Sequence, residues 1–168
     1  MIFIQAAPAY SQQPATQDST VHKAMAKALQ LTGMWSGDGW IQMGKEKQTF
    51  IQTENVVQKA NGAVLIIDGI GVDATTKKTV HDAFAVMSYD RANQKYLMRA
   101  FLANGNYMDA DIRFEADGTI IWGFKHPVAG EIKYTIKVAN GKWEEKREMN
   151  RDGTNWVPFF QMNLVKNN

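Results

Sequence analysis

The sequence contains no cysteine, only three histidines and no long run of hydrophobic residues. Without cysteine the protein has no disulfide, no thiolate nucleophile and no Cys-ligated metal, so its stability must come from a packed core. With hydrophobic residues at 45% and charged residues at 21%, the composition indicates neither a disordered chain nor a membrane-spanning one. The 168 residues suit a single globular domain with one hydrophobic core.

The charged residues show no strong excess of either sign. There are 19 Lys and Arg against 17 Asp and Glu, and the two signs are interleaved along the chain. A basic stripe that would follow a phosphate backbone is therefore absent from the sequence. We expect no nucleic acid as a partner.

The first dozen residues combine an apolar run, MIFI, with a stretch of small residues, AAPAYSQ. This pattern is typical of the end of a secretory signal peptide, and Ala7-x-Ala9 or Ala9-x-Ser11 would suit signal peptidase. The positively charged start of a signal is missing, so we expect Met1 to be an internal start. A disordered N-terminal tail is the alternative interpretation of these residues. We expect a signal-peptide remnant and linker at 1–18, one domain at 19–168, and a periplasmic or secreted protein.

A helix is predicted over residues 20–31, where Ser19 or Thr20 can cap it and Gly33 ends it. Beyond Gly33 the apolar residues alternate with a period of two, and turn dipeptides such as Asn61-Gly62 and Asp117-Gly118 separate the runs. The runs predict strands at 34–43, 48–58, 63–72, 80–89, 95–103, 106–115, 119–125, 131–139, 143–150 and 155–166. So many antiparallel strands tend to close, because closure removes exposed edges. We expect an all-β fold, a closed antiparallel up-and-down barrel of about ten strands that is lipocalin-like, with one N-terminal helix.

Alternation in the later strands assigns their side chains to the two faces of the barrel. One face of strand 143–150 is wholly charged and must face water, so the other face points inward with Trp143, Glu145, Arg147 and Met149. For 63–72, 80–89 and 95–103 both faces are apolar, which leaves their orientation open. The same test places further residues inside, namely Met108, Ala110, Ile112, Phe114, Ile120, Trp122, Phe124, His126, Ile132, Tyr134, Ile136, Val138, Trp156, Phe160, Met162 and Leu164.

The segment LTGMWSGDG, residues 31–39, resembles the opening of a calycin, the superfamily of lipocalins, fatty-acid-binding proteins and nitrobindins. Its mark is Gly-x-Trp on the first strand, here Gly33 and Trp35. The resemblance covers about residues 20–168 and implies a barrel that binds a ligand without established chemistry, with Lys166 against Trp35. The chain is most similar to an uncharacterised bacterial calycin family, domain of unknown function 1579, through Asp117-Gly118, Trp122, Trp143, Glu145, Asp152-Gly153 and Trp156.

Nitrobindin-type barrels, which this chain also resembles, carry haem through a histidine near the end of the chain. The last predicted strand contains Gln161 and Met162 but no histidine. A haem would therefore need His126 or His81 as its ligand. His126 stands before Pro127 at a strand end, which predicts a place at the barrel rim, facing either a ligand mouth or plain solvent.

Glu145 and Arg147 are the most informative candidate site. Two ionisable groups on an apolar inner face must be paired, solvated or bound to a ligand head group. An arginine suits a carboxylate or phosphate, whereas a mutual ion pair between positions i and i+2 is the alternative. Glu54 joins this interior network if its face of the second strand points inward, although the opposite face with Ile51 and Thr53 suits the interior almost as well.

Trp122, Phe124, Tyr134, Phe160 and Met98 would supply an aromatic lining with one adaptable thioether, which suits an elongated or planar apolar ligand. The alternative is a barrel filled solid by the same side chains. The glycines within strands, Gly37, Gly39, Gly69 and Gly71, are predicted to permit sharp bending rather than to cradle phosphate.

The leading hypothesis is a non-catalytic protein of the cell envelope that binds a small apolar or amphipathic ligand without a cofactor. No nucleophile triad, metal-ligand spacing or Gly-rich phosphate loop is present in the sequence. The first alternative is an isomerase or cyclase that uses Glu145 or Glu54 as a general base. The second is a haem- or porphyrin-binding barrel.

Overall fold

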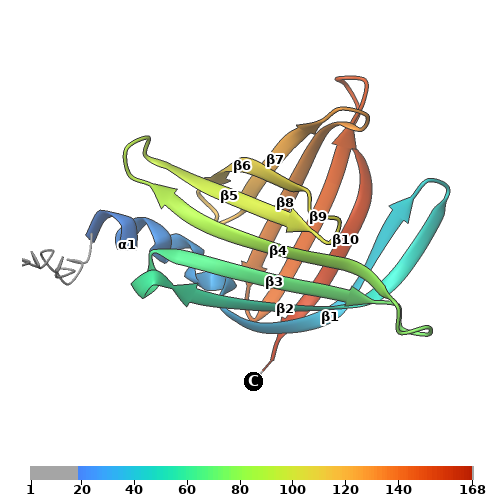
Figure 1. Ribbon diagram of the computed structural model, residues 1–168, viewed down its shortest axis with the longest axis horizontal. Helices are drawn as coiled ribbons and strands as arrows, with labels where there is room; N and C mark the ends of the chain where they lie inside the picture. The colour runs from blue at the N-terminus through green and yellow to red at the C-terminus, as the bar shows by residue number, and fades with distance from the viewer. Residues whose placement is uncertain (1–18, 168) are drawn as a thin grey trace, which may run out of the picture.

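The computed structural model describes residues 19–167, so the predicted signal-peptide remnant at 1–18 lies outside the described residues. Ten antiparallel strands form one closed barrel in which each strand pairs with its neighbours in sequence and β10 closes on β1 (Figure 1). The predicted fold class is confirmed. The strands are β1 Gly33–Met43, β2 Glu46–Lys59, β3 Val64–Val72, β4 Thr79–Asp90, β5 Lys95–Leu102, β6 Tyr107–Phe114, β7 Ile120–His126, β8 Gly130–Ala139, β9 Lys142–Asn150 and β10 Val157–Lys166.

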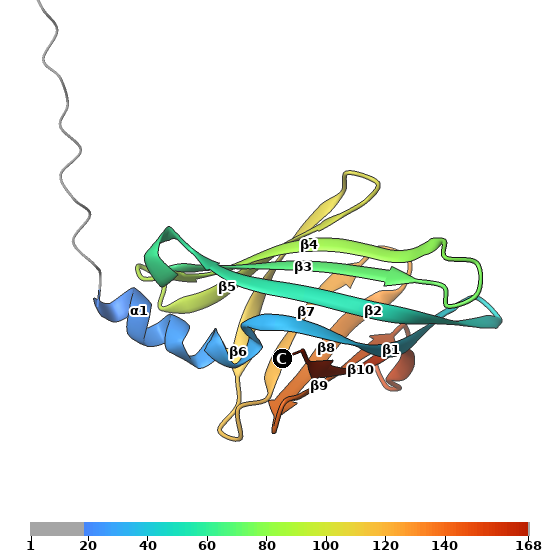
Figure 2. The ribbon, with the colours of Figure 1, turned by 90° about the horizontal axis from the view of Figure 1, so that it is seen from below.

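The N-terminal helix covers one end of the barrel (Figure 2). It begins as α1 Ser19–Met25 and tightens into the 3-10 helix η1 Ala26–Leu31, where a uniform helix was predicted. Met25, Ala28 and Leu31 are buried against the strand ends. Tyr96 Oη donates a hydrogen bond to Ala24 O at 2.8 Å, which fixes the helix to β5. The short 3-10 helix η2 Ala60–Gly62 joins β2 to β3 at the same end.

The inward face of β9 agrees with the alternation of the sequence. Trp143 and Glu145 are buried and Arg147 is half-buried, whereas Glu144 and Lys146 on the outer face are exposed. Glu148 departs from this pattern, because it is buried on the outer face, where Lys133 and Lys146 cover it at 3.1 and 2.7 Å. The outer face is therefore charged throughout but not uniformly exposed.

The inward placement predicted for Trp156 is wrong. Strand β10 begins only at Val157 and has an irregularity in its register between Pro158 and Phe160. A bulge of this kind reverses the alternation of the residues before it. Trp156 is consequently 36% exposed, and its ring lies 4.2 Å from Lys133 Nζ outside the barrel.

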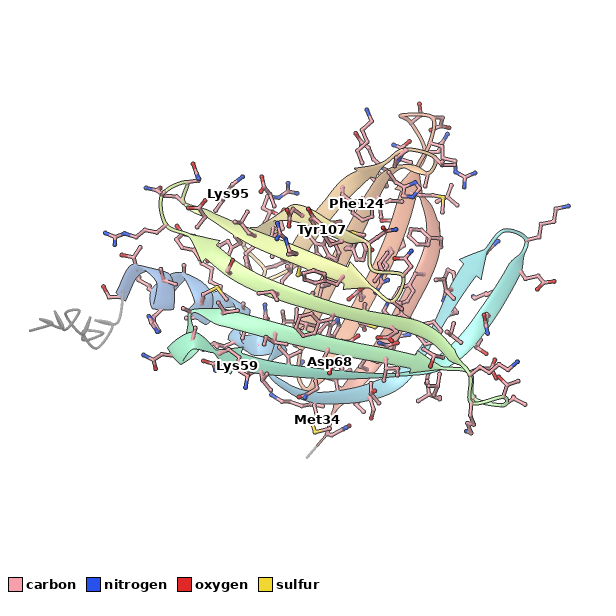
Figure 3. All side chains as sticks on the ribbon, in the orientation of Figure 1. Met34, Lys59, Asp68, Lys95, Tyr107 and Phe124 are labelled. Carbon is pink, nitrogen blue, oxygen red and sulfur yellow. The ribbon has the colours of Figure 1, made fainter. Side chains whose placement is uncertain are left out.

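Strands β6 and β7 are paired along only part of their length. Ile112, Arg113 and Phe114 have Cα partners on β7, and these partners are Trp122, Ile121 and Ile120. Residues 107–111 and 123–126 have no partner in this pairing, and the two strands diverge toward the barrel end opposite α1 (Figure 1). Tyr107 on β6 and Phe124 on β7, labelled in Figure 3, both belong to the unpaired lengths.

Candidate functional site

An interior cavity of about 70 Å³ lies within the barrel. One part of its wall is made of small and flexible apolar side chains from β4, β5 and β6, which are Ala83, Ala85, Ala100, Met98 and Met108. The facing part carries polar and aromatic groups, namely Glu54, His81, Glu145, Arg147, Trp122, Tyr134 and Trp143. Leu102, which is 38% exposed, also lines the cavity and marks the side nearest to solvent.

Arg147 is held by protein groups on several sides. Its Nε donates to Glu145 Oε1 at 2.8 Å, and its Nη1 lies 3.1 Å from His81 Nε2. The guanidinium also lies 3.6 Å from the ring centroid of Phe160 and 4.8 Å from that of Tyr134, within the range of cation–π attraction. Burial lowers the pKa of Arg147, but Glu145 and Tyr134 outweigh it and raise the pKa above its ordinary value. Arg147 is therefore charged and largely satisfied by the barrel itself.

Glu54 is buried on the inner face of β2 and has an amide as its hydrogen-bond partner. Gln52 Nε2 donates to Glu54 Oε1 at 2.8 Å. Directly across on β3 lies Gly69, where an added Cβ would stand 2.4 and 2.5 Å from the two carboxylate oxygens. Gly69 therefore provides the space that the Glu54 carboxyl occupies.

Gly71 has the same relation to Gln52. The two residues are Cα partners, and a Cβ on Gly71 would lie 2.6 Å from Gln52 Oε1. The predicted role of these strand glycines was to permit bending of the barrel. The structure adds a more local reason, because a larger residue at Gly69 or Gly71 would collide with the buried polar chains of β2.

His81 on β4 completes the polar cluster. Arginine can only donate, so His81 Nε2 accepts from Arg147 and the ring proton lies on Nδ1. Burial, and then the charge of Arg147, lower the pKa of His81 to about 3, so the ring is neutral at pH 7. Its Nδ1 stands 3.5 Å from Gln52 Nε2, the same atom that donates to Glu54. Gln52 Oε1 is buried without a hydrogen-bond partner.

The two carboxyl groups of the cluster differ in their partners. Glu145 has the guanidinium of Arg147, whereas the hydrogen-bond partner of Glu54 is the neutral amide of Gln52. Burial first, and then the neighbouring charge of Glu145, raise the pKa of Glu54 to about 8, although the Gln52 amide and Arg147 act in the opposite direction. Glu54 is therefore mainly protonated at pH 7.

Aromatic rings form one wall of the cavity. Trp122 on β7 and Tyr134 on β8 are stacked across the strands with centroids 3.6 Å apart. The indole Nε1 atoms of Trp122 and Trp143 are buried without a hydrogen-bond partner. Because an indole N–H is a donor only, each of these two buried groups lacks an acceptor.

The residues predicted from the sequence to contact a ligand fall into two groups. Arg147, Glu145, Glu54, Trp122, Tyr134 and Met98 line the cavity. Phe160 is fully buried behind it against Phe50 and Arg147, and Phe124 packs beside Tyr134. His126 is exposed, and its Nδ1 accepts from the backbone N–H groups of Val128 and Ala129 in the turn that follows.

The Gly-x-Trp motif lies at the end of the barrel that α1 covers. Trp35 is 1% exposed, and its Nε1 donates to Leu31 O at 2.8 Å. Lys166 is its Cα partner on β10, with Nζ 5.3 Å from the indole centroid. Gly33 has a φ of +119°, and an added Cβ would lie 2.7 Å from Lys166 Cε. The motif thus ties the start of β1 to the end of β10.

Four residues of the site were given no leading role from the sequence. Gln52 was given no role, His81 was considered only as a haem ligand, and Ala83 and Ala85 of β4 were not assigned because both faces of that strand are apolar. Gly69 lies across from Glu54, and Gly71 lies across from Gln52. This pairing of a glycine with each buried polar residue is the signal that would have identified Gln52 as part of the site. It requires the register between β2 and β3, which the sequence alone does not state.

Comparison with known proteins finds similarity in structure and not in sequence. No family model matches the chain, and no curated protein is similar to it in sequence. The structure of Rv2717c from M. tuberculosis is similar, with a TM-score of 0.64 and 10% identity over 88% of this chain and 98% of that one. The S-type phycobiliprotein lyase CPES from Guillardia theta matches with a TM-score of 0.61 and 10% identity, over 88% of this chain and 93% of that one. The fold is calycin-like. At such low identity the likeness concerns the fold alone.

Residues 19–167 contain neither a long apolar helix nor a cluster of metal-ligating side chains. No helix in this part of the chain is long and apolar enough to span a membrane. No group of His, Cys, Asp and Glu side chains among these residues is placed to hold a metal ion.

Proposed function

We propose that the barrel binds a small amphipathic molecule in its interior and does not act on it chemically. The observation that carries this proposal is the cavity, in which an apolar wall of alanines and methionines faces a buried polar cluster. Binding sites for small molecules combine mostly apolar walls with a few polar groups that fix orientation. The similarity in fold to a phycobiliprotein lyase is consistent with a small-molecule ligand.

The size of the cavity limits what binds without rearrangement. Its volume of about 70 Å³ is well below the roughly 300–1,000 Å³ of usual ligand pockets. Met98, Met108 and Leu102 form the flexible part of the wall, and methionine adapts readily to a changed shape. We infer that a ligand enters where β6 and β7 are unpaired and displaces these side chains.

Haem does not fit the histidines of the structure. Both ring nitrogens of His81 face protein groups, Arg147 on one side and Gln52 on the other, and the cavity is far smaller than a porphyrin. His126 is exposed outside the cavity, with its Nδ1 used by the following turn.

An isomerase or cyclase is the second candidate function. Glu54 favours it, because a buried carboxyl that lines a cavity and has a pKa of about 8 is suited to exchange protons near neutral pH. Turnover of a cyclic or enolisable substrate that disappears in Glu54→Gln would support this candidate over simple binding.

Native mass spectrometry of the protein purified from its own host tests the proposal. A bound small molecule should appear as an added mass that is lost under denaturing conditions. Ala85→Leu, which fills the cavity, should remove it, whereas Ala92→Leu in an exposed turn should not. Absence of any bound mass, together with no binding of short apolar probes to the wild-type protein, would contradict the proposal.

We propose a place in the cell envelope on the basis of residues 1–12, whose apolar run and small residues suit a secretory signal. Cell fractionation with an antibody against the protein tests this location. We also propose membership of the uncharacterised bacterial calycin family, domain of unknown function 1579, on the Gly33 and Trp35 motif and the tryptophan pattern. A profile built from new homologues of this chain would test that membership.

A further inference from the structure

The acidic and basic groups that line the cavity are unequal in number. Within residues 19–167 its lining contains two carboxyl groups, Glu54 and Glu145, but a single guanidinium, Arg147. His81 adds no charge at pH 7, because its pKa is lowered to about 3. One acidic group of the lining therefore has no cationic counterpart.

Arg147 is already committed to the protein. Its Nε is 2.8 Å from Glu145, its Nη1 is 3.1 Å from His81, and the ring of Phe160 covers its face at 3.6 Å. A ligand carboxylate would have to compete with Glu145 for the guanidinium, and it would add a third acidic group to a buried site. Placing unpaired charge in an apolar interior is costly, so the cavity disfavours an acidic ligand.

Glu54 is the group without a cation. Among the described residues its side chain accepts from the Gln52 amide, and the groups acting on it electrostatically are Glu145 and Arg147 from β9 and Asp68 from β3. Gly69 keeps the space beside both of its oxygens free of a side chain. The carboxyl also lines the cavity, so a bound molecule can reach it.

We propose that the cavity selects amphipathic ligands whose polar end is a basic nitrogen, such as an alkylamine, with Glu54 as the counter-ion. This inference rests on the proposed function, since it names the ligand class of the same cavity. The ammonium group binds to the Glu54 carboxylate, while the apolar part contacts Ala83, Ala85 and Ala100. The charges of the lining are then equal, two negative groups against Arg147 and the ligand.

Proton release follows from this arrangement. Before binding, Glu54 is mainly protonated at pH 7, because its pKa is raised to about 8. An alkylammonium ion remains protonated at this pH, like lysine, so forming the ion pair expels the proton of Glu54. In this exchange the protonated Glu54 carboxyl binds R–NH₃⁺ and releases one H⁺ to solvent. The product is an ion pair between the Glu54 carboxylate and R–NH₃⁺.

Three probes of equal chain length separate the alternatives, namely n-butylamine, n-butanol and n-butyric acid. Binding is followed by the NMR signals of the indole N–H groups, because Trp122 and Trp143 line the cavity. We expect the amine to bind most tightly and the acid most weakly. Calorimetry at pH 7 in buffers of different ionisation enthalpy should show release of about one proton per bound amine and none for the alcohol.

Glu54→Gln provides the decisive variant, because an amide replaces the carboxyl with almost no change of shape. It should weaken amine binding by about tenfold or more, abolish proton release and weaken butanol binding far less than amine binding. Glu144→Gln, on the exposed outer face of β9, is the matched control and should bind all probes like the wild type.

The failures of the two proposals are distinguishable. If butanol or butyric acid binds to the cavity at least as tightly as butylamine, or if Glu54→Gln weakens butanol and butylamine equally, the inference about the basic nitrogen is overturned and the proposed function stands. If none of the probes shifts the indole signals and Ala85→Leu behaves like the wild type, both proposals are overturned.

Discussion

The two sides of the barrel differ in how they are filled. On the side of β1, β2, β9 and β10 the interior holds large, fully buried side chains, among them Trp35, Phe50, Trp143 and Phe160. On the side of β4, β5 and β6 it holds mainly alanines and methionines, and the cavity lies against them. The first side also has strands paired along nearly their whole length, whereas β6 and β7 share pairing at only one end.

This difference shows that one closed sheet can serve two purposes. Large rings and the motif of Gly33, Trp35 and Lys166 stabilise the filled side, which provides a rigid support for the polar cluster. Small side chains opposite leave room that a closed, fully packed barrel would lack. Large side chains therefore fill one side of the barrel, and small side chains leave the cavity on the other.

Trp35→Ala should give the largest loss of stability. It removes a fully buried ring that packs edge-on against Trp143 with centroids 5.7 Å apart, and it also removes the hydrogen bond to Leu31 O. We expect the free energy of unfolding to fall by roughly 3–5 kcal/mol in denaturant melts. A loss below about 1 kcal/mol would mean that the filled side is not the stabilising one.

Arg147→Met should cost nearly as much, although methionine fills a similar volume. The Glu145 carboxylate would lose its ion pair while remaining buried, and breaking such a pair costs roughly 3–5 kcal/mol. Because Glu145 already holds the guanidinium, the loss should be the same with and without ligand. Arg99→Met, which breaks an exposed pair with Asp109, is the control and should change stability far less than Arg147→Met.

The pH dependence of stability should separate Glu54 from His81. Between pH 4.5 and about 8 the native state keeps the Glu54 proton that the unfolded chain loses, so this group makes stability fall as the pH rises through that range. His81 acts in the opposite sense, because between about pH 3 and 6.5 only the unfolded chain takes up its proton, and stability falls as the pH drops. The two slopes oppose each other from pH 4.5 to 6.5.

Glu54→Gln should therefore remove the decline in stability between pH 6.5 and 8, an effect of roughly 1–2 kcal/mol. His81→Phe should leave that decline in place. Chemical denaturation repeated across this pH range measures both. An unchanged decline in Glu54→Gln would show that Glu54 is ionised in the native protein at pH 7. Glu54 and Glu145 would then not differ in protonation, which would contradict the comparison of the two carboxyl groups.

Period-two alternation and turn dipeptides predict the strands well, because both are local properties of the chain. The bulge in β10 is not local, since it depends on pairing with β9, and it explains why the inward placement of Trp156 was wrong. The ambiguity at β4 and β5 has a physical cause as well. Phe84 and Phe101 on their outer faces are 39% and 37% exposed, so hydrophobicity does not distinguish outside from inside there. The cluster of Gln52, Glu54 and His81 needs cross-strand register, which no single strand contains.

The smallest expected effect compares two methionines on the two sides of the barrel. Met98 on β5 lines the cavity and Met162 on β10 lies in the filled side, and both point inward and are almost fully buried. Leucine has nearly the same volume but branches at Cγ, and such exchanges usually cost less than about 1.5 kcal/mol. Tightly packed surroundings cannot accommodate the branch, whereas the cavity beside Met98 leaves space for it.

We therefore expect Met162→Leu to lower the free energy of unfolding by about 1 kcal/mol and Met98→Leu to change it by less than about half of that. Equal losses in paired denaturant melts would show that the two sides are equally well packed, and the cavity would then be too small to influence the energetics of its own wall.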